Sequence, residues 1–384
     1  MTDQTWHRVW DLFHASLERN AAERDAYLAA ECGEDQVLRR AVLRLLDAHD
    51  GADTFLEQPA VPAAVGGPHD DPGEGDLVGP YRLRRLVGAG GMGLVYEAEP
   101  VDGPAGRVAV KLIRAGIDTA QLVARFESER RALALMQHPN IARVLDAGVT
   151  GDGRSYFVME YVPGTPLTEY CDRNLLPVGE RLTLFATVCG ALHHAHETGI
   201  IHRDVKPSNV LVAEEGSRAV PKVIDFGIAK LTRKAVGTTV KLTALGSFMG
   251  TPEYMSPEQA GLTTARVDAR TDVFSLGVLL YELLVGRQPF RPETFRGQSV
   301  EEIRRILREE IPPPASARFA ALAPDRAAEV ARQRRTTPDA LSRALRHGLD
   351  ALLARAMEKD PARRHASASD LAAEIARAQE LIAR

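Results

Sequence analysis

The pattern of apolar residues changes near Tyr81, and this change constrains the fold more than any other feature of the 384-residue chain. From Tyr81 to Ile113 the runs YRLRRLV, LVYEAE and RVAVKLI alternate or carry β-branched residues, with turn signals between them, which predicts strands. A helix is expected at about 117–136, followed by two strand-like runs ending in YFVMEY, and the pattern after Pro163 is mostly helical. Two short strand-like pieces, NVLV and KVIDF, interrupt this helical region. The sequence therefore predicts an α+β chain with a small β-rich lobe, residues 81–161, and a large helical lobe, residues 162–384.

Two segments precede this region. Residues 1–60 carry apolar side chains at helical spacing, for example from Trp6 to Leu17, and are predicted to form a short helical extension. Residues 61–80 are rich in Pro, Gly and acidic side chains, so we expect a flexible linker there.

Charge and cysteine content exclude several classes of protein. The chain has 48 Lys plus Arg against 52 Asp plus Glu, a formal net charge of −4, which argues against nucleic acid as a partner. Its three cysteines, Cys32, Cys171 and Cys189, form no CxxC pair and fit a reducing compartment. The longest apolar run, residues 273–285, is interrupted by Glu282 and is too short to span a bilayer. We therefore expect a buried helix at this run, no membrane segment, and a cytoplasmic protein.

A glycine-rich turn, GAGGMG, lies between the first two predicted strands and begins at Gly88. A dinucleotide-binding turn would lead from a strand into a helix, whereas here another strand, LVYEAE, follows. A glycine-rich turn inside a hairpin lets backbone amides close over phosphates, so we expect a nucleotide site of that kind.

Lys111 lies on the third predicted strand, on the same face as Ala109 and opposite Val108 and Val110. In the next predicted helix, Glu129 lies on the apolar stripe, where an unpaired carboxylate would be costly. Lys111 is the nearest candidate partner in this architecture, and such a pair could hold phosphate oxygens.

Further along, the chain reads His202-Arg203-Asp204, with Lys206 and Asn209 close behind, and then Asp225-Phe226-Gly227. The two aspartates are 21 residues apart, and both follow the glycine-rich turn, Lys111 and Glu129. In this order the sequence resembles the protein kinases, specifically the eukaryotic-like Ser/Thr kinases of bacteria, over residues 81–384. The resemblance implies the bilobal protein-kinase fold, here preceded by a short helical extension.

The resemblance also implies roles for individual residues. Asp204 matches the catalytic base. Lys206 matches a lysine that contacts the γ-phosphate and favours Ser/Thr substrates. Asn209 and Asp225 match the Mg²⁺ ligands. With Lys111 and Glu129 these form the predicted catalytic set. The expected ATP-binding residues are Val87, Gly88, Ala89, Gly90, Gly91, Met92, Gly93, Val95, Ala109, Lys111, Met159, Glu160, Val162, Leu211 and Asp225.

Further matches are structural. Asp272 is expected to anchor the catalytic-loop backbone, and Glu258 to pair with Arg364. The side chains of Leu133, Val144, His202 and Phe226 match a hydrophobic column between the lobes. His193 and His196, one helical turn apart, are read as the end of a helix. The insert at 318–337 matches no tight pattern, and no site is predicted there.

Regulation is expected in the segment between Asp225 and Glu253, which contains four basic residues and no acidic one. Arg203 directly precedes the catalytic Asp204, and kinases with such an arginine often depend on a phosphorylated segment of this kind. The candidate phosphorylation sites are Thr238, Thr239, Thr243 and Ser247, and Thr243 ranks first because of its position eight residues before Thr251. Trans-autophosphorylation there would require transient self-association.

The motifs bear on three possible functions. The complete catalytic set favours an active Ser/Thr protein kinase that uses ATP and Mg²⁺ and acts on protein substrates, against a pseudokinase scaffold. The run GTPEYMSPEQA, residues 250–260, resembles the loop that cradles a substrate peptide, which argues against a small-molecule phosphotransferase.

Overall fold

The computed structural model describes residues 71–90, 93–102, 106–113, 137–216, 218–226, 252–261, 267–296 and 298–382, with twelve scattered positions between 12 and 42. Several sequence predictions fall elsewhere in the chain. The helix expected at 117–136, with Glu129 and Leu133, lies outside the described residues, as do Gly91, Met92 and the four candidate phosphorylation sites.

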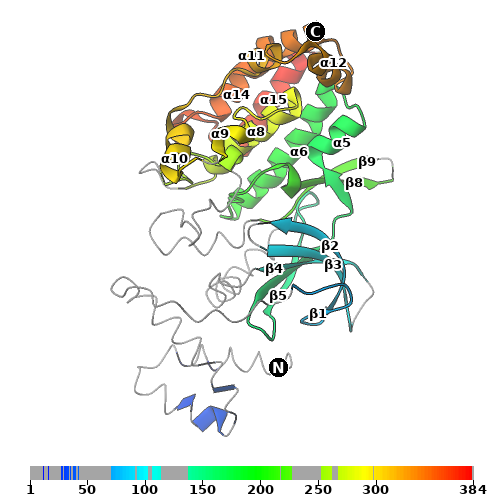
Figure 1. Cartoon of the computed structure of the whole chain (residues 1–384), viewed down its shortest axis with the longest axis vertical. Helices are drawn as coiled ribbons and strands as arrows, with labels where there is room; N and C mark the ends of the chain where they lie inside the picture. The colour runs from blue at the N-terminus through cyan, green and yellow to red at the C-terminus, as the bar shows by residue number, and fades with distance from the viewer. Residues whose placement is uncertain are drawn as a thin grey trace.

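The N-terminal lobe is a six-stranded antiparallel sheet with strand order β1-β2-β3-β4-β6-β5, as Figure 1 shows below the helical lobe. Its strands are β1 (Leu77–Val78), β2 (Tyr81–Gly90), β3 (Gly93–Pro100), β4 (Val108–Ile113), β5 (Val144–Val149) and β6 (Ser155–Glu160). The predicted strand runs at Tyr81, at LVYEAE, at RVAVKLI and before Tyr161 are therefore confirmed.

The two faces of this sheet pack differently, and the strand register decides which residues share a face. Val95 pairs with Lys111, and Lys111 with Phe157, so these three side chains lie on one face. Val108, Val110 and Leu112 lie on the opposite face in an apolar cluster with neighbouring strands. All six residues of β4 are buried. Lys111 and Ala109 therefore share a face of the sheet, as the alternation of side chains along the strand predicts.

The ordered sheet starts inside the segment expected to be a flexible linker. β1 pairs with β2, Leu77 opposite Arg82 and Val78 opposite Tyr81, and Val78 is 2% exposed. Upstream, the hydroxyl of Tyr96 donates to the carbonyl of Pro72 at 2.7 Å. Residues 71–80 therefore differ from the expectation, because backbone pairing and one buried valine fix them to the sheet despite their Pro and Gly content.

The C-terminal lobe is mostly helical, with a three-stranded sheet, β7-β8-β9, next to the first lobe. The sheet contains β7 (Gly164–Pro166), β8 (Val210–Glu215) and β9 (Arg218–Val223). The α-helices are α5 (Leu167–Arg173), α6 (Val178–Glu197), α8 (Arg270–Val285), α9 (Pro292–Phe295), α10 (Val300–Glu309), α11 (Ala315–Ala320), α12 (Pro324–Gln333), α13 (Pro338–Ala344), α14 (Asp350–Ala356) and α15 (Ala368–Ile382). Shorter helical turns are η1 (Pro207–Asn209), η3 (Pro252–Tyr254), η4 (Leu345–Leu349) and η5 (Pro361–Arg363).

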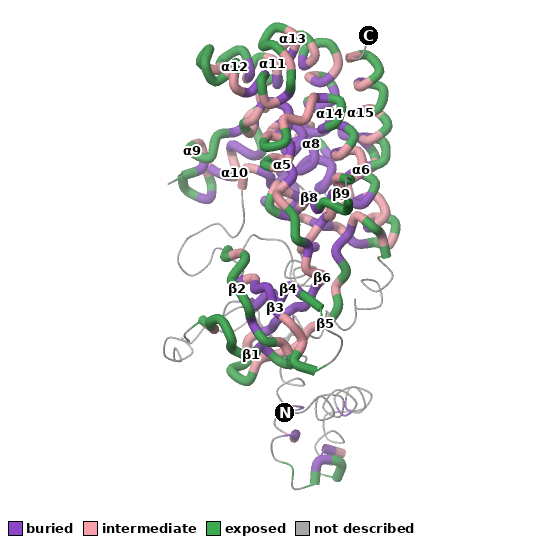
Figure 2. The backbone as a smooth tube through the Cα atoms, turned by 90° about the vertical axis from the view of Figure 1, so that its right-hand side faces the viewer, coloured by how far each residue is buried: buried purple, intermediate pink, exposed green. Residues whose placement is uncertain are grey.

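Helix α8 forms the centre of this lobe, as the buried colouring in Figure 2 shows. Every residue from Thr271 to Val285 except Glu282 is buried, which confirms the buried helix expected from the apolar run. A Cβ on Gly277 would lie 2.8 Å from that of Ala356, so this glycine allows α14 to pack closely. No helix among the described residues has the length and apolarity needed to cross a membrane.

The segment at 318–337 contributes a cap to α8. Arg334, which is 1% exposed, donates from Nη2 to the carbonyl of Leu283 at 2.9 Å and from Nε to that of Leu284 at 2.6 Å. Burial lowers the pKa of this guanidinium to about 9, and the charge of Arg181 acts in the same direction. Arg334 therefore satisfies the last carbonyls of the central helix.

Candidate active site

The catalytic loop is fixed by one buried carboxylate, that of Asp272 in the first turn of α8. The backbone N–H of His202 donates to Asp272 Oδ2 at 2.8 Å, and that of Arg203 to Oδ1 at 2.7 Å. His196 Nε2 lies 2.7 Å from Oδ2. Burial by itself would raise the pKa of the Asp272 carboxyl, but the hydrogen bonds and charges of these neighbours outweigh it and lower the pKa. The predicted anchoring role of Asp272 is confirmed.

A strained backbone conformation at Arg203 turns the chain between the part held by Asp272 and the catalytic Asp204. Arg203 has a φ of 65°, in the left-handed region that non-glycine residues rarely adopt. Its carbonyl accepts a hydrogen bond from Gln259 Nε2 at 2.7 Å, so the loop is held from two sides. Asp204 Oδ2 then lies 2.9 Å from Lys206 Nζ, and Asn209 Nδ2 donates to the same oxygen at 3.1 Å. The predicted base, lysine and amide are thus brought together.

The hairpin of β8 and β9 brings Asn209 and Asp225 together. Val210 pairs with Val223, and just beyond this pair the N–H of Ile224 donates to the Asn209 carbonyl at 2.9 Å. Asp225 follows with a φ of 55°. The next residue, Phe226, packs on the His202 ring with centroids 4.7 Å apart, and Val144 packs partly buried against the same core cluster. Of the predicted hydrophobic column, His202 and Phe226 are therefore in direct contact.

The donor set of this pair fits Mg²⁺. The Asn209 amide nitrogen is used by Asp204, which leaves the amide oxygen for another partner. With the Asp225 carboxylate it provides two hard oxygen ligands, and Mg²⁺ usually takes one or two protein ligands plus water and phosphate.

Lys111 links the two lobes through an ion pair with the Asp225 carboxylate, Nζ to Oδ2. The two residues are 114 positions apart in the chain, and Lys111 is 9% exposed. The predicted pair of Lys111 with Glu129 is a different contact and remains a prediction, because Glu129 lies outside the described residues. The Lys111 ammonium therefore lies against Asp225, which is also a predicted Mg²⁺ ligand.

The apolar residues expected to contact adenine are found on both lobes. Ala109 on β4 pairs with Met159 on β6, and both are buried. Val162 forms a small apolar cluster with Ala213, against which Leu211 packs. The Glu160 side chain is occupied by Lys222, whose Nζ lies 2.7 Å from Oε1, and the backbone N–H of Glu160 donates to the Arg143 carbonyl at 2.8 Å.

The described residues of the glycine-rich turn lie at the ends of β2 and β3. Gly88, Ala89 and Gly90 end β2, and Gly93 begins β3. Val87, beside them, is 39% exposed. Gly93 has a φ of 154°, and a Cβ there would collide with the carbonyl of Leu112. Only glycine therefore lets β3 approach β4 this closely.

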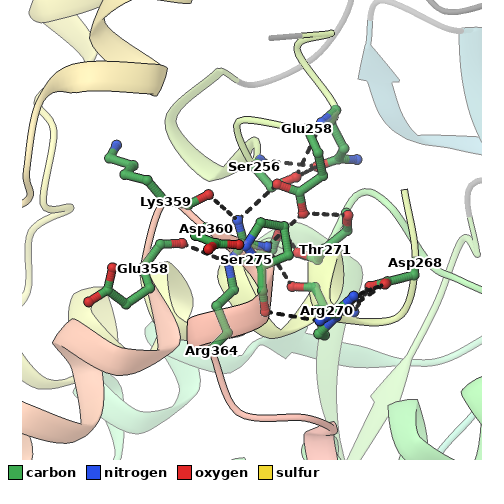
Figure 3. A network of polar contacts seen from close by, with 12 residues as sticks. Ser256, Glu258, Asp268, Arg270, Thr271, Ser275, Glu358, Lys359, Asp360 and Arg364 are labelled. Carbon is green, nitrogen blue, oxygen red and sulfur yellow. Dashed lines mark hydrogen bonds and ion pairs between the residues drawn. The ribbon is translucent and has the colours of Figure 1, made fainter. Parts of the chain in front are cut away.

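The segment expected to cradle a peptide is tied firmly to the helical lobe (Figure 3). Arg364 donates to Glu258 through two bonds, Nη1 to Oε1 at 2.6 Å and Nη2 to Oε2 at 2.8 Å. Thr271 Oγ1 adds a bond to Glu258 Oε1 at 2.8 Å, and Ser275 Oγ donates to the Tyr254 carbonyl at 2.7 Å. Burial alone would raise the pKa of the Glu258 carboxyl, but Arg364 lowers it overall. The predicted Glu258–Arg364 pair is confirmed.

Comparison with known proteins agrees with this geometry. The protein kinase domain family matches residues 81–375. The chain belongs to the protein kinase family. The kinase is 41% identical over 254 residues to the serine/threonine-protein kinase Pkn1 of Myxococcus xanthus, covering 66% of this chain and 35% of that protein. It is 40% identical over 245 residues to PknA of Mycobacterium tuberculosis, covering 62% of this chain and 53% of the relative.

A solved structure shows the same fold. The kinase domain of Mycobacterium tuberculosis PknI superposes with a TM-score of 0.56 at 27% identity, covering 80% of this chain and all (100%) of that one. The bilobal fold and the relation to bacterial Ser/Thr kinases are therefore confirmed. The kinase spans about a third to a half of the curated relatives' length, 35% of Pkn1 and 49% of pkn3, which is also from Myxococcus xanthus.

Three contacts at this site were not predicted from the sequence. These are the bond from His196 to Asp272, the bond from Gln259 to the Arg203 carbonyl, and the ion pair of Lys111 with Asp225. The sequence offered only weak signals for them, such as the position of His196 near the end of a helix that leads into the catalytic loop.

Proposed function

We propose that the chain is an active Ser/Thr protein kinase that transfers the γ-phosphate of ATP to Ser or Thr hydroxyls of proteins. The observation that carries this proposal is the convergence of Asp204, Lys206 and Asn209 on one side with the Lys111–Asp225 pair on the other. A pseudokinase scaffold would not require this complete set.

Each side chain then has a defined task. Asp204 would accept a hydrogen bond from the substrate hydroxyl and take its proton as the oxygen attacks. Lys206, already within 2.9 Å of Asp204, would contact the transferred phosphoryl group. Lys111 would hold the other phosphates of ATP from the opposite lobe. Mg²⁺, held by Asn209 and Asp225, would supply positive charge that neutralises the phosphates.

ATP would lie between the lobes. Its adenine would fit between Val95, Ala109 and Met159 above and Leu211 below, with backbone groups of residues 160–162 reading its edge. The glycine-rich turn at 88–93 would cover the phosphates. This assignment extends the family's use of ATP and a divalent metal to individual residues of this chain.

Substrate class and location follow from the same features. The double anchoring of the segment 252–260, by Arg364 and by α8, supports a fixed platform for a protein substrate rather than a small molecule. Cys171 and Cys189 are free and buried, and with the use of ATP they favour a cytoplasmic location for this domain.

The test is the variant Asp204→Asn. It should lower phosphate incorporation from labelled ATP into a generic protein substrate by on the order of 10²–10⁴-fold, because a neutral amide cannot accept the proton. ATP binding and the thermal unfolding midpoint should stay close to those of the unmodified protein. Asp339→Asn, at an exposed position on α13, is the matched control and should remain active. Near-normal activity of Asp204→Asn would refute the assignment.

A further inference from the structure

The loop at 286–291 lies against the segment that would cradle the substrate. It begins where α8 ends, at Gly286, which has a φ of 70°. Gln288 Nε2 donates to the hydroxyl of Tyr254 at 2.8 Å. Phe290 belongs to the same apolar cluster as Met255. Charges on this loop therefore stand beside the peptide platform of residues 252–260.

Three arginines, Arg287, Arg291 and Arg318, gather at this loop, and we call them the arginine surface. Arg287 and Arg291 are exposed. Arg318, from α11, donates through Nη2 to the carbonyls of Gln288 and Pro289, each at 3.3 Å. Its Nε is buried and has no hydrogen-bond partner. Burial lowers the pKa of Arg318, and the positive charges of Arg291 and Arg287 lower it further.

Within the described part of the chain, no carboxylate forms an ion pair with any of these three arginines. Two acidic groups on neighbouring elements are already engaged. Asp350 accepts hydrogen bonds from the N–H and hydroxyl of Ser316. Glu282 accepts a hydrogen bond from the Tyr254 hydroxyl, and burial raises the pKa of this carboxyl, which favours its uncharged form.

Some surface arginines of the same lobe, by contrast, are paired with carboxylates. On α10, Arg305 lies 2.7 Å from Glu302 and 2.9 Å from Glu310. Arg308 lies 2.6 Å from Glu309. The arginine surface differs from these pairs because its three positive charges lie around one loop beside the peptide platform, where like-charge repulsion is unfavourable without an anion.

We propose that the arginine surface binds an acidic segment of the protein substrate, next to the residue that is phosphorylated. Guanidinium groups bind carboxylate and phosphate oxygens through paired, charge-assisted hydrogen bonds. Arg287 and Arg291 make the contacts, and Arg318 is a positioning residue that braces the loop through its backbone. This inference rests on the proposed protein-kinase function, because it names the chemistry of that substrate.

The experiment measures binding, so that it does not depend on knowing the natural substrate. Fluorescent peptides share one core, residues 236–249 of this chain, and continue in a run of glutamates, of glutamines or of phosphoserines. Affinities are measured by anisotropy for the full chain, for the double variant Arg287→Ala with Arg291→Ala, and for a control double variant, Arg363→Ala with Arg377→Ala. The control removes the same charge from exposed positions on η5 and α15. Thermal unfolding of each variant establishes that it is folded.

The unmodified protein should bind the glutamate peptide about fivefold more tightly than the glutamine peptide, as expected for two surface charge contacts. Raised salt should remove this preference. The Arg287/Arg291 variant should lose it, and the control variant should keep it. Comparison of the glutamate and phosphoserine peptides shows whether carboxylate or phosphate is the preferred anion. Equal binding of the glutamate and glutamine peptides, or a preference that survives in the Arg287/Arg291 variant, would overturn the inference.

Kinase activity toward a generic protein is measured in parallel, so that the two failures can be told apart. An active enzyme without an acidic preference would refute only the arginine surface. An inactive protein with intact acidic binding would refute only the proposed function.

Discussion

At the scale of single residues, the buried carboxylate of Asp272 organises more of the active site than any of the reacting groups. It satisfies two consecutive backbone N–H groups, those of His202 and Arg203, and one imidazole, that of His196. A charge this deeply buried is tolerated because several donors surround it. The catalytic loop therefore owes its shape to a residue that touches no substrate.

Lys111 gives the first prediction at this scale. Lys111→Met should lower kcat/KM because the ammonium beside Asp225 is lost, and Glu129→Ala should lower it by removing the partner predicted for Lys111. Because the two residues would act as a unit, the double variant should be little worse than the weaker single variant. Steady-state kinetics of all three variants at saturating Mg²⁺ test this. Losses that add in full would show that Lys111 and Glu129 act independently.

Lys359 gives a prediction about pH. Its Nζ donates to the Leu307 carbonyl at 2.7 Å and lies 5.3 Å from the centroid of the Phe290 ring. Burial lowers its pKa from 10.5 to about 8, and the charge of Arg364 contributes. Between these two pH values the unfolded state binds more protons than the folded state. The free energy of unfolding should therefore rise with pH over this window, at up to about 1.4 kcal/mol per pH unit.

Denaturant unfolding of the unmodified protein and of Lys359→Met across this pH window measures the effect. Cysteines and tyrosines titrate in both proteins, so their contribution cancels in the difference. The unmodified protein should gain stability relative to Lys359→Met as pH rises. Parallel pH profiles for the two proteins would contradict the prediction.

At the scale of secondary-structure elements, the active site is assembled by short connections between rigid pieces. The β8–β9 hairpin aligns Asn209 with Ile224, the residue before Asp225. Helix α8 presents Asp272 at its start and receives Arg334 at its end. Irregular segments can hold functional side chains because strands and helices fix both of their ends.

The pair of Glu258 with Arg364 belongs to this scale, because it joins the peptide platform to η5. Arg364 is 3% exposed and Glu258 is 2% exposed. Arg364→Ala should reduce the free energy of unfolding by about 3–5 kcal/mol, since it leaves a buried carboxylate without its partner. Its neighbour Arg363 is exposed, so Arg363→Ala is the control and should stay within about 0.5 kcal/mol. Equal stability of the two variants in urea unfolding would show that the ion pair contributes nothing.

At the scale of the whole molecule, regulation would depend on the encounter of two copies. The segment between Asp225 and Glu253 is basic and carries Thr243, and phosphate there could pair with arginines such as Arg203. We predict trans-autophosphorylation at Thr243 and a clear loss of kcat/KM in Thr243→Ala. The initial rate of autophosphorylation per molecule should increase with enzyme concentration, because the reaction is bimolecular.

Mass spectrometry of the active enzyme and a concentration series measure both outcomes. The inactive Asp204→Asn variant serves as a substrate-only partner, which the unmodified enzyme should phosphorylate. An active enzyme with no phosphate on Thr238, Thr239, Thr243 or Ser247 would defeat the proposal. A rate per molecule that is independent of concentration would show that the reaction occurs within one copy.

Apolar spacing and short motifs were enough to predict the lobe order, the strands of the first lobe, the buried helix α8, and candidate residues such as Asp204, Asn209 and Asp272. These features depend on apolar spacing and on motifs that extend over a few residues, and such signals survive without knowledge of the packing. The roles of Asp272 and of the Glu258–Arg364 pair followed from the family resemblance, and the structure confirmed the contacts.

Contacts between groups far apart in the chain could not be predicted from these local patterns. The tertiary structure paired Lys111 with Asp225, added His196 to Asp272, extended the sheet back to Leu77, and gathered Arg318 with Arg287 and Arg291 at one loop. Each of these contacts joins two elements, and the apolar pattern that predicts each element does not depend on the contact. Their choice depends on how helices and strands pack around a common core, and on which polar groups that packing buries and must then satisfy.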